Sequence, residues 1–159
     1  MLETPAPCSV ASAVSVNPAT GRVLVTQAVC QSRDDEGFGY FTSDGQPTEM
    51  LFRFGALSPS LNPPRWAADG SLFLFSATDG GASSLYAYIV DQKQARPIIA
   101  AGDNRRIESG AVAPDGSAIV DCLRDNVQRT VDLHVLDLTK EPPVDKAITS
   151  DGASCDPAF

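Results

Sequence analysis

A short turn motif recurs along the chain and constrains the fold more than any other feature. Its clearest copies are Ala67-Ala68-Asp69-Gly70-Ser71 and Ala113-Pro114-Asp115-Gly116-Ser117, and Asn17-Pro18-Ala19-Thr20-Gly21-Arg22 is a looser first copy. The glycines of the three copies follow one another at intervals of 49 and 46 residues. A period of this length indicates a propeller, a solenoid or another repeat array.

Apolar runs flank each copy in the same order, and these runs predict strands. The run Leu72-Phe73-Leu74-Phe75 is continuous, which predicts a strand covered on both faces. No long segment has the 3.6-residue apolar period of a helix, and turn signals recur at the short spacing of all-β proteins. The chain is therefore predicted to be all-β. A β-sandwich is the alternative, but it gives no reason for one turn to recur at the same place in each group of four strands.

The predicted architecture is a β-propeller segment of about three four-stranded antiparallel blades in an incomplete ring. Residues 1–9 are predicted to be an N-terminal tail, and residues 10–159 the propeller, with blades at 10–55, 64–101 and 109–149. Residues 156–159 resemble the opening of the second blade and are predicted to begin another blade. Propellers close with about four to eight blades. Three alternatives follow: a larger propeller in a longer parent chain, a homodimer that closes one ring, or an arc packed on another protein.

Composition excludes several classes of partner. With 43% hydrophobic and 20% charged residues among 159, the chain has a globular composition. The net charge of −8 and only 12 Lys and Arg residues argue against nucleic-acid binding. No apolar run is long enough to suggest membrane insertion. The first residues lack the basic and apolar regions of a signal peptide, so we expect either a cytoplasmic chain or one that starts after a removed signal.

The four cysteines, Cys8, Cys30, Cys122 and Cys155, are far apart in sequence and form no C-x-x-C pair. This spacing argues against a zinc site or a redox dithiol. The first interpretation is that they are buried or incidental thiols, and the second is that they form at least one disulfide. Spacing alone does not decide the connectivity.

The repeats resemble the TolB-type β-propeller family, found in TolB and in the propeller domains of prolyl oligopeptidase and dipeptidyl peptidase relatives. That pattern is an aromatic residue, a Ser-Pro-Asp-Gly turn, an apolar strand, a Gly- or Ser-containing connection, an apolar strand ending in Asp, and a last strand. The second unit matches it at Trp66, Asp69-Gly70-Ser71, 72–76, 85–91 and 97–99, and the third at Val112, 113–117, 118–123, 133–137 and 147–149. The resemblance implies the propeller fold and a periplasmic or extracellular location. It also implies roles ranging from protein-binding scaffold to enzyme lid or ligand sensor.

The sequence predicts no catalytic, cofactor-binding or metal-binding residues. The nearest approach to a G-x-S-x-G nucleophile turn, Gly152-Ala153-Ser154-Cys155-Asp156, lacks the second glycine. The single histidine, His134, lies in a predicted strand and is expected to be structural. Asp34-Asp35-Glu36 lacks the spacing of an EF-hand loop. Asp69 and Asp115 are expected to form turns rather than to bind ligands.

The loops are the predicted site of recognition. In a propeller, the connections from second to third strand and from one blade to the next share one rim, and loops on a rigid scaffold commonly carry binding residues. Charged residues of these loops form the candidate partner-binding set: Arg33, Asp34, Asp35, Arg105, Arg106, Arg124 and Asp125.

Three functional hypotheses remain on the sequence alone. The first is a non-catalytic propeller segment that binds a protein or serves as a scaffold. The second is the propeller domain of a serine hydrolase or peptidase whose catalytic domain lies outside this chain. The third is a propeller that binds a small molecule or calcium.

Overall fold

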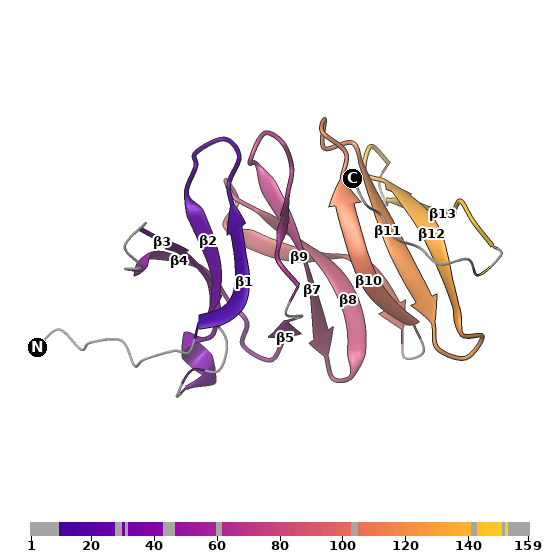
Figure 1. The fold of residues 1–159 in the computed structure, drawn as a ribbon, viewed down its shortest axis with the longest axis horizontal. Coiled ribbons are helices and arrows are strands. Elements are labelled where there is room, and N and C mark those ends of the chain that lie inside the picture. Colours follow the sequence, from indigo (N-terminus) through magenta and orange to yellow (C-terminus); the bar gives the residue numbers. More distant parts are fainter. Residues whose placement is uncertain are drawn as a thin grey trace, which may run out of the picture.

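A computed structural model describes residues 10–27, 30, 32–42, 47–59, 62–102, 105–140, 143–150 and 152. The fold of these residues is all-β, and three antiparallel sheets follow one another along the chain without closing into a ring (Figure 1). The prediction of an incomplete propeller of about three blades is therefore confirmed. The predicted tail at residues 1–9 and the predicted opening of a next blade at 156–159 lie outside the described residues.

Blade 1 is a meander of four strands in the order β1-β2-β3-β4. Its strands are β1 (Val10–Val16), β2 (Val23–Gln27), β3 (Gly37–Phe41) and β4 (Pro47–Arg53). A short 3-10 helix, η1 (Arg33–Asp35), lies in the connection between β2 and β3.

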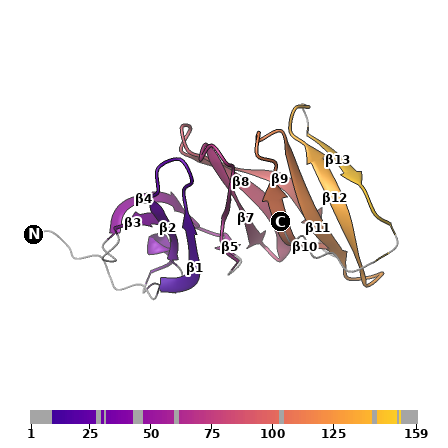
Figure 2. The same cartoon turned by 45° about the horizontal axis from the view of Figure 1, so that its top comes forward.

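Blades 2 and 3 repeat this order beside it (Figure 2). In blade 2 the first strand is split into two short pieces, both paired with the next strand. Blade 2 contains β5 (Ser58–Pro59), β6 (Arg65–Trp66), β7 (Leu72–Asp79), β8 (Ala82–Ile89) and β9 (Gln94–Gly102). Blade 3 contains β10 (Arg105–Val112), β11 (Ala118–Asp125), β12 (Thr130–Asp137) and β13 (Val144–Ala147). The part of the chain that the structure describes has no helix with the length and apolar character needed to cross a bilayer.

The repeated motif forms the turn that leads into β2, β7 and β11, the equivalent strands of the three blades. In blade 3, the Gly116 N–H donates to the Ala113 carbonyl at 2.8 Å. One Asp115 carboxylate oxygen accepts from the Ser117 hydroxyl at 2.6 Å and from its N–H at 3.0 Å. These bonds favour the carboxylate and hold the pKa of Asp115 below its ordinary value. The corresponding bonds of Asp69 are the same, so both aspartates form turns as predicted.

The three turns have the same length, because the N–H groups of Asn17, Ala67 and Ala113 each donate to the carbonyl five residues ahead, but the glycine of the first turn lies one position later. There the Gly21 N–H donates to the Asn17 carbonyl, four residues back, whereas Gly70 and Gly116 each donate three residues back. Residues after the first turn are therefore displaced by one position relative to an alignment of the glycines. Because side chains alternate between the two faces of a strand, an alignment of the glycines assigns the residues of blade 1 to the wrong faces, whereas strand register makes Val23, Phe73 and Ile119 equivalent.

Each blade has two faces, which we name by what they pack against. The A face points toward the preceding blade, and the B face toward the following one. Equivalent positions of the A face are Val23 and Val25, Phe73 and Phe75, and Ile119 and Asp121 in blades 1, 2 and 3, and the equivalent B-face position is Leu24, Leu74 and Val120.

The junction between blades 1 and 2 is aromatic. Phe38, on the B face of blade 1, is 1% exposed and meets Phe73 and Phe75 of the next A face edge-on, with ring centroids 5.1 and 4.8 Å apart. Phe54 approaches the same ring at 4.8 Å. Edge-to-face geometry is a favourable arrangement of aromatic pairs. Phe73, Leu74 and Phe75 are all buried, which confirms the predicted strand covered on both faces.

The junction between blades 2 and 3 is aliphatic. Its buried residues are Leu74, Leu85, Ala87 and Ile99 from blade 2, with Ile119, Leu123 and Leu136 from blade 3. Both junctions therefore use the same rule: the B face of one blade packs on the A face of the next.

A buried asparagine joins the first two turns. Asn17 is 2% exposed, and its amide group donates to the Tyr40 hydroxyl and to the Gly70 carbonyl, each at 3.3 Å. Its Oδ1 accepts from the N–H groups of Ala19 and Thr20 at 2.9 and 3.1 Å. The side chain therefore fixes its own turn and attaches that turn to blade 2.

This contact separates two glycines with the same backbone conformation. Gly70 and Gly116 have φ values of +70° and +71°, a region strained for other residues. A Cβ on Gly70 meets the Ala19 Cβ at 2.9 Å and the Asn17 Cγ at 3.1 Å, whereas a Cβ on Gly116 has nothing within 4 Å.

We expect Gly116→Ala to lower the free energy of unfolding by about 1–2 kcal/mol, because only the backbone is strained. Gly70→Ala is expected to cost clearly more, because the new methyl group also displaces Asn17. Urea denaturation of both variants measures the difference. Equal losses for the two substitutions would show that the Asn17 contact does not constrain Gly70.

Candidate functional site

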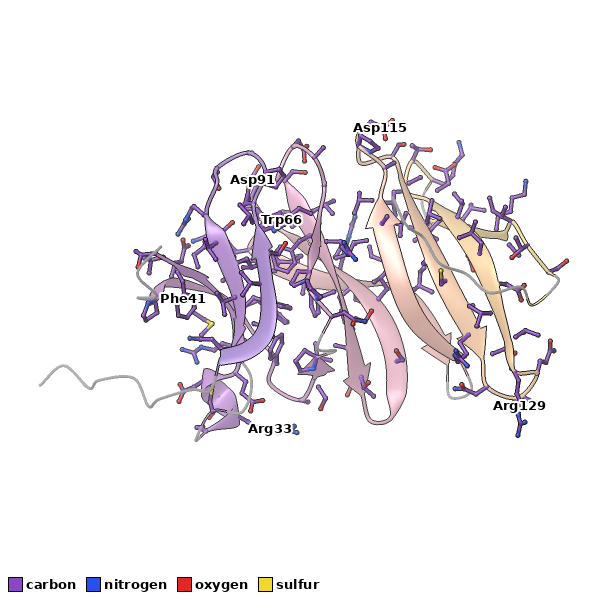
Figure 3. The ribbon with its side chains drawn as sticks, in the orientation of Figure 1. Arg33, Phe41, Trp66, Asp91, Asp115 and Arg129 are labelled. Carbon is purple, nitrogen blue, oxygen red and sulfur yellow. The ribbon has the colours of Figure 1, made fainter. Side chains whose placement is uncertain are left out.

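The predicted binding residues lie on the rim opposite the Asp-Gly turns. Figure 3 shows Asp115 at the upper edge of the molecule and Arg33 and Arg129 at the lower edge. The lower rim carries η1 in blade 1 and the β11–β12 turn in blade 3. The upper rim carries the repeated turns, together with the strand ends next to them: the Leu138 N–H donates to the Ser117 carbonyl at 2.9 Å.

On blade 1, the lower rim is anchored by an arginine that the sequence did not single out. The Ser32 hydroxyl caps η1 by accepting from the Asp34 N–H at 3.2 Å. The Arg53 guanidinium contacts the Asp34 carbonyl oxygen and lies 3.5 Å from the Asp35 carboxylate. These bonds hold the backbone of η1 while the Arg33 and Asp34 side chains remain exposed to solvent.

On blade 3, strand pairing brings the other four predicted residues together. The register of β10 with β11 places Arg105 opposite Asp125 and Arg106 opposite Arg124. One Asp125 carboxylate oxygen accepts from the N–H groups of Val127 and Gln128, at 2.8 and 2.9 Å, and so shapes the turn that follows.

Arg129 completes that turn at the end of the lower rim. It is exposed, and its φ of +56° is unusual for a residue other than glycine. Nothing in the sequence distinguishes it from other loop arginines. Its place follows from the tight β11–β12 connection.

The seven predicted residues thus form two groups rather than one patch. Arg33, Asp34 and Asp35 lie on blade 1, and the other four lie on blade 3. Between them, the rim of blade 2 is the β7–β8 turn at Gly80 and Gly81, two glycines with positive φ. The rim therefore presents charge at both ends of the arc and a small, open turn in the middle.

A buried acid lies inside the junction between blades 2 and 3. Asp121 is 1% exposed, and both of its carboxylate oxygens are without a hydrogen-bond partner among the described residues. It occupies the position that Phe75 fills in blade 2. Burial raises the pKa of Asp121 to about 7; the nearby His134 lowers it and Asp145 raises it.

His134 and Asp145 share this face of blade 3. His134 lies directly opposite Asp121 on β12, and its Nδ1 is 3.0 Å from an Asp145 carboxylate oxygen. The sequence predicted a structural histidine but indicated neither partner, because both contacts come from strand register. Within the described part of the chain, no three His, Cys, Asp or Glu side chains are arranged to hold a metal ion.

The cysteines correct one interpretation of the sequence. Cys30 and Cys122 are both disulfide-bonded, and no cysteine among the described residues is free. Interpreting them as incidental thiols was therefore wrong. The reason is that spacing along the chain does not reveal which cysteines the fold brings together. Cys8 and Cys155 lie outside the described residues.

Comparisons with known proteins identify the fold only. No family model matches the chain, and no curated protein matches it. A structure of a putative TolB from Agrobacterium tumefaciens is similar over 93% of this chain and 50% of its own, with 12% identity and a TM-score of 0.65. A chain of a nidogen/laminin complex is similar over 87% of this chain and 48% of its own, with 13% identity and a TM-score of 0.59.

These similarities support the propeller-like fold that the repeats predicted. At such low identities they carry no information about activity. The chain spans about half the length of both structures.

Proposed function

We propose that this chain is a non-catalytic propeller module that binds a protein partner through its lower rim. The observation that carries the proposal is that exposed arginines at both ends of the rim, Arg33 and Arg129, lie on backbone held by side-chain hydrogen bonds. A preorganised loop loses less conformational freedom on binding. Arginine is also enriched among the residues that dominate interface energetics.

Two further observations support the proposal. One of the similar structures is a complex of nidogen with laminin, so a chain of related fold occurs in a protein–protein assembly. The disulfides at Cys30 and Cys122 fit an oxidising compartment. We therefore infer a periplasmic or extracellular site for the encounter.

The test compares two charge-reversed variants of the immobilised chain in an extract of the cells that produce it. The lower-rim variant carries Arg33→Glu and Arg129→Glu. The control variant carries Lys93→Glu and Lys140→Glu, which lie in the connections that follow β8 and β12 on the upper rim. Each pair changes the net charge by the same amount, and each contains one residue with positive φ, Arg129 or Lys93.

We expect a partner that the unmodified chain and the upper-rim variant both capture and the lower-rim variant loses. Equal capture by both variants, or equal loss by both, would contradict recognition through the lower rim. Circular dichroism of each variant confirms that it retains the fold.

A further inference from the structure

The A face of blade 1 is an apolar sheet surface with no blade of the described residues packed on it. Val14 and Val16 on β1 are 51% and 54% exposed. Strand register places them opposite Val25 and Val23, and Val23 lies opposite Phe41. Directly opposed residues share a face of the sheet. The surface therefore continues from the edge strand across the blade.

A glycine makes this face shallow in its middle. Gly39 lies opposite Val25, at the position where blade 2 has Tyr86 stacked on Phe75. A Cβ on Gly39 lies 3.4 Å from the Phe41 ring, which shows that the ring reaches over the glycine. The A face of blade 1 is thus flatter and smaller in its side chains than the A face that blade 2 presents to blade 1.

At the other end of the arc, the B face of blade 3 resembles the B faces of blades 1 and 2, which form the two junctions inside the chain. Val120 lies opposite Val135, and Leu133 lies opposite Cys122 on the same face. Val120 is the equivalent of Leu24 and Leu74, which are both buried in the two junctions inside the chain. Val144 extends the face onto β13 and is 52% exposed. No sheet within the described ranges covers it.

The two uncovered faces are therefore the two halves of one kind of junction. Within the chain, a B face packs on the next A face twice, first through aromatic and then through aliphatic side chains. The uncovered pair is an A face at the start and a B face at the end. Val14, Val16 and Val144 are exposed on these faces, while Val25 and Cys122 within them are buried. Exposed apolar sheet surface of this kind marks an interaction site.

We propose that a second copy of this chain covers both faces, with the B face of blade 3 of each copy packed on the A face of blade 1 of the other. Two such contacts, related by a two-fold axis, close a ring of six blades. Propellers have about four to eight blades. One copy of this chain spans 48% and 50% of the two similar structures, so two copies are about as long as one of them. A head-to-tail contact gives a closed ring only when its rotation closes, and otherwise gives filaments.

The mass of the chain in solution, measured by light scattering during size-exclusion chromatography, tests the proposal. The expected result is a species of twice the 16.7 kDa chain mass and no larger assembly. Val16→Asp on the A face and Val144→Asp on the B face are each expected to abolish this species, because each places a charge in both contacts of the ring. Val127→Asp is the matched control, since Val127 is 71% exposed in the β11–β12 turn and lies on neither face.

Mixing the two face variants distinguishes the head-to-tail arrangement from other dimers. In a mixed pair, the B face of the Val16→Asp copy and the A face of the Val144→Asp copy are both unchanged. One contact is therefore intact, and the two-chain species is expected to return in part. A dimer formed between two A faces would not respond to Val144→Asp and would not be restored by mixing.

Three results would overturn the proposal. The first is an unmodified chain with the mass of one chain at every concentration, which would leave the faces to further blades of a longer chain or to another protein. The second is a series of masses above two chains. The third is a two-chain species that Val16→Asp leaves intact. Far-UV circular dichroism and melting of each variant show that a lost dimer is not a lost fold, and Val16→Thr is the milder substitution if the aspartate variant unfolds.

Discussion

Replacing Asp121 by asparagine raises the melting temperature at pH 8 by roughly 10 °C, and hardly changes it at pH 4. Asparagine has the shape of the protonated acid without its ability to ionise. In the folded chain, burial raises the pKa of Asp121 from 3.8 to about 7. A change of that size corresponds to about 4 kcal/mol of stability.

The sign follows from where the proton is held. Between pH 3.8 and pH 7, the folded chain keeps the Asp121 proton and the unfolded chain has lost it. Stability that is present below pH 3.8 is therefore lost as the pH rises, and the loss is complete above pH 7. The difference between variant and unmodified chain is expected to grow over this interval and then to level off.

Calorimetry at a series of pH values measures the effect, with Asp145→Asn as the control. Asp145 lies on the same face, but its side chain is 42% exposed, whereas that of Asp121 is buried. His134 and Asp145 are the charged or titratable side chains that act on Asp121 from this face, and the residues of blade 2 buried against it are apolar. His134→Gln removes the imidazole that lowers the pKa of Asp121, and so shows how much of the effect depends on that contact. Equal melting of Asp121→Asn and the unmodified chain at pH 8 would show that the buried carboxyl pays no penalty for its charge.

Phe38→Ala is the second large expected effect, with a loss of about 3–5 kcal/mol in the free energy of unfolding. The ring is 1% exposed and contacts three other aromatic rings, one from its own blade's end and two from blade 2. Its removal leaves a cavity between two sheets, and the surrounding structure relaxes only in part to fill it. The loss therefore weakens the junction rather than one blade.

Urea denaturation measures this loss, and Phe52→Ala is the matched control in the same blade. Phe52 is half-buried at the border of the cluster, 5.7 Å from the ring of Phe75 and 6.0 Å from that of Phe54. Solvent already reaches it, so its removal is expected to cost clearly less. A Phe52→Ala loss as large as that of Phe38→Ala would contradict the assignment of Phe38 as the centre of the junction.

The fold was predictable because its signals are local. Asp69 and Asp115 bond to the serine two residues ahead, so the turn is encoded in five adjacent residues. The apolar run at 72–75 needs only its own composition to indicate a strand covered on both faces. The first turn is the exception, because its glycine lies one position later and the Asn17 side chain that holds the turn also contacts blade 2.

The site was less predictable because its contacts cross the chain. Arg33 and Arg129 reach the same rim only through the stacking of three sheets. Arg53 contacts η1 from the end of β4, the last strand of blade 1, and no sequence spacing indicates that pairing. Asp121 interrupts an apolar strand, which is a visible signal, but its burial depends on the B face of blade 2.

The two unlike junctions have a consequence for how the chain comes apart. Each blade contacts only its neighbours, so stability in such a stack is distributed over the junctions. The first junction is a cluster of interlocked aromatic rings, and the second contains a carboxyl group that is ionised in alkaline solution. We therefore expect blades 1 and 2 to behave as one cooperative unit and blade 3 as another, with opening that starts from the C-terminal end of the stack. In alkaline solution, unfolding is thus expected to proceed from blade 3 toward blade 1.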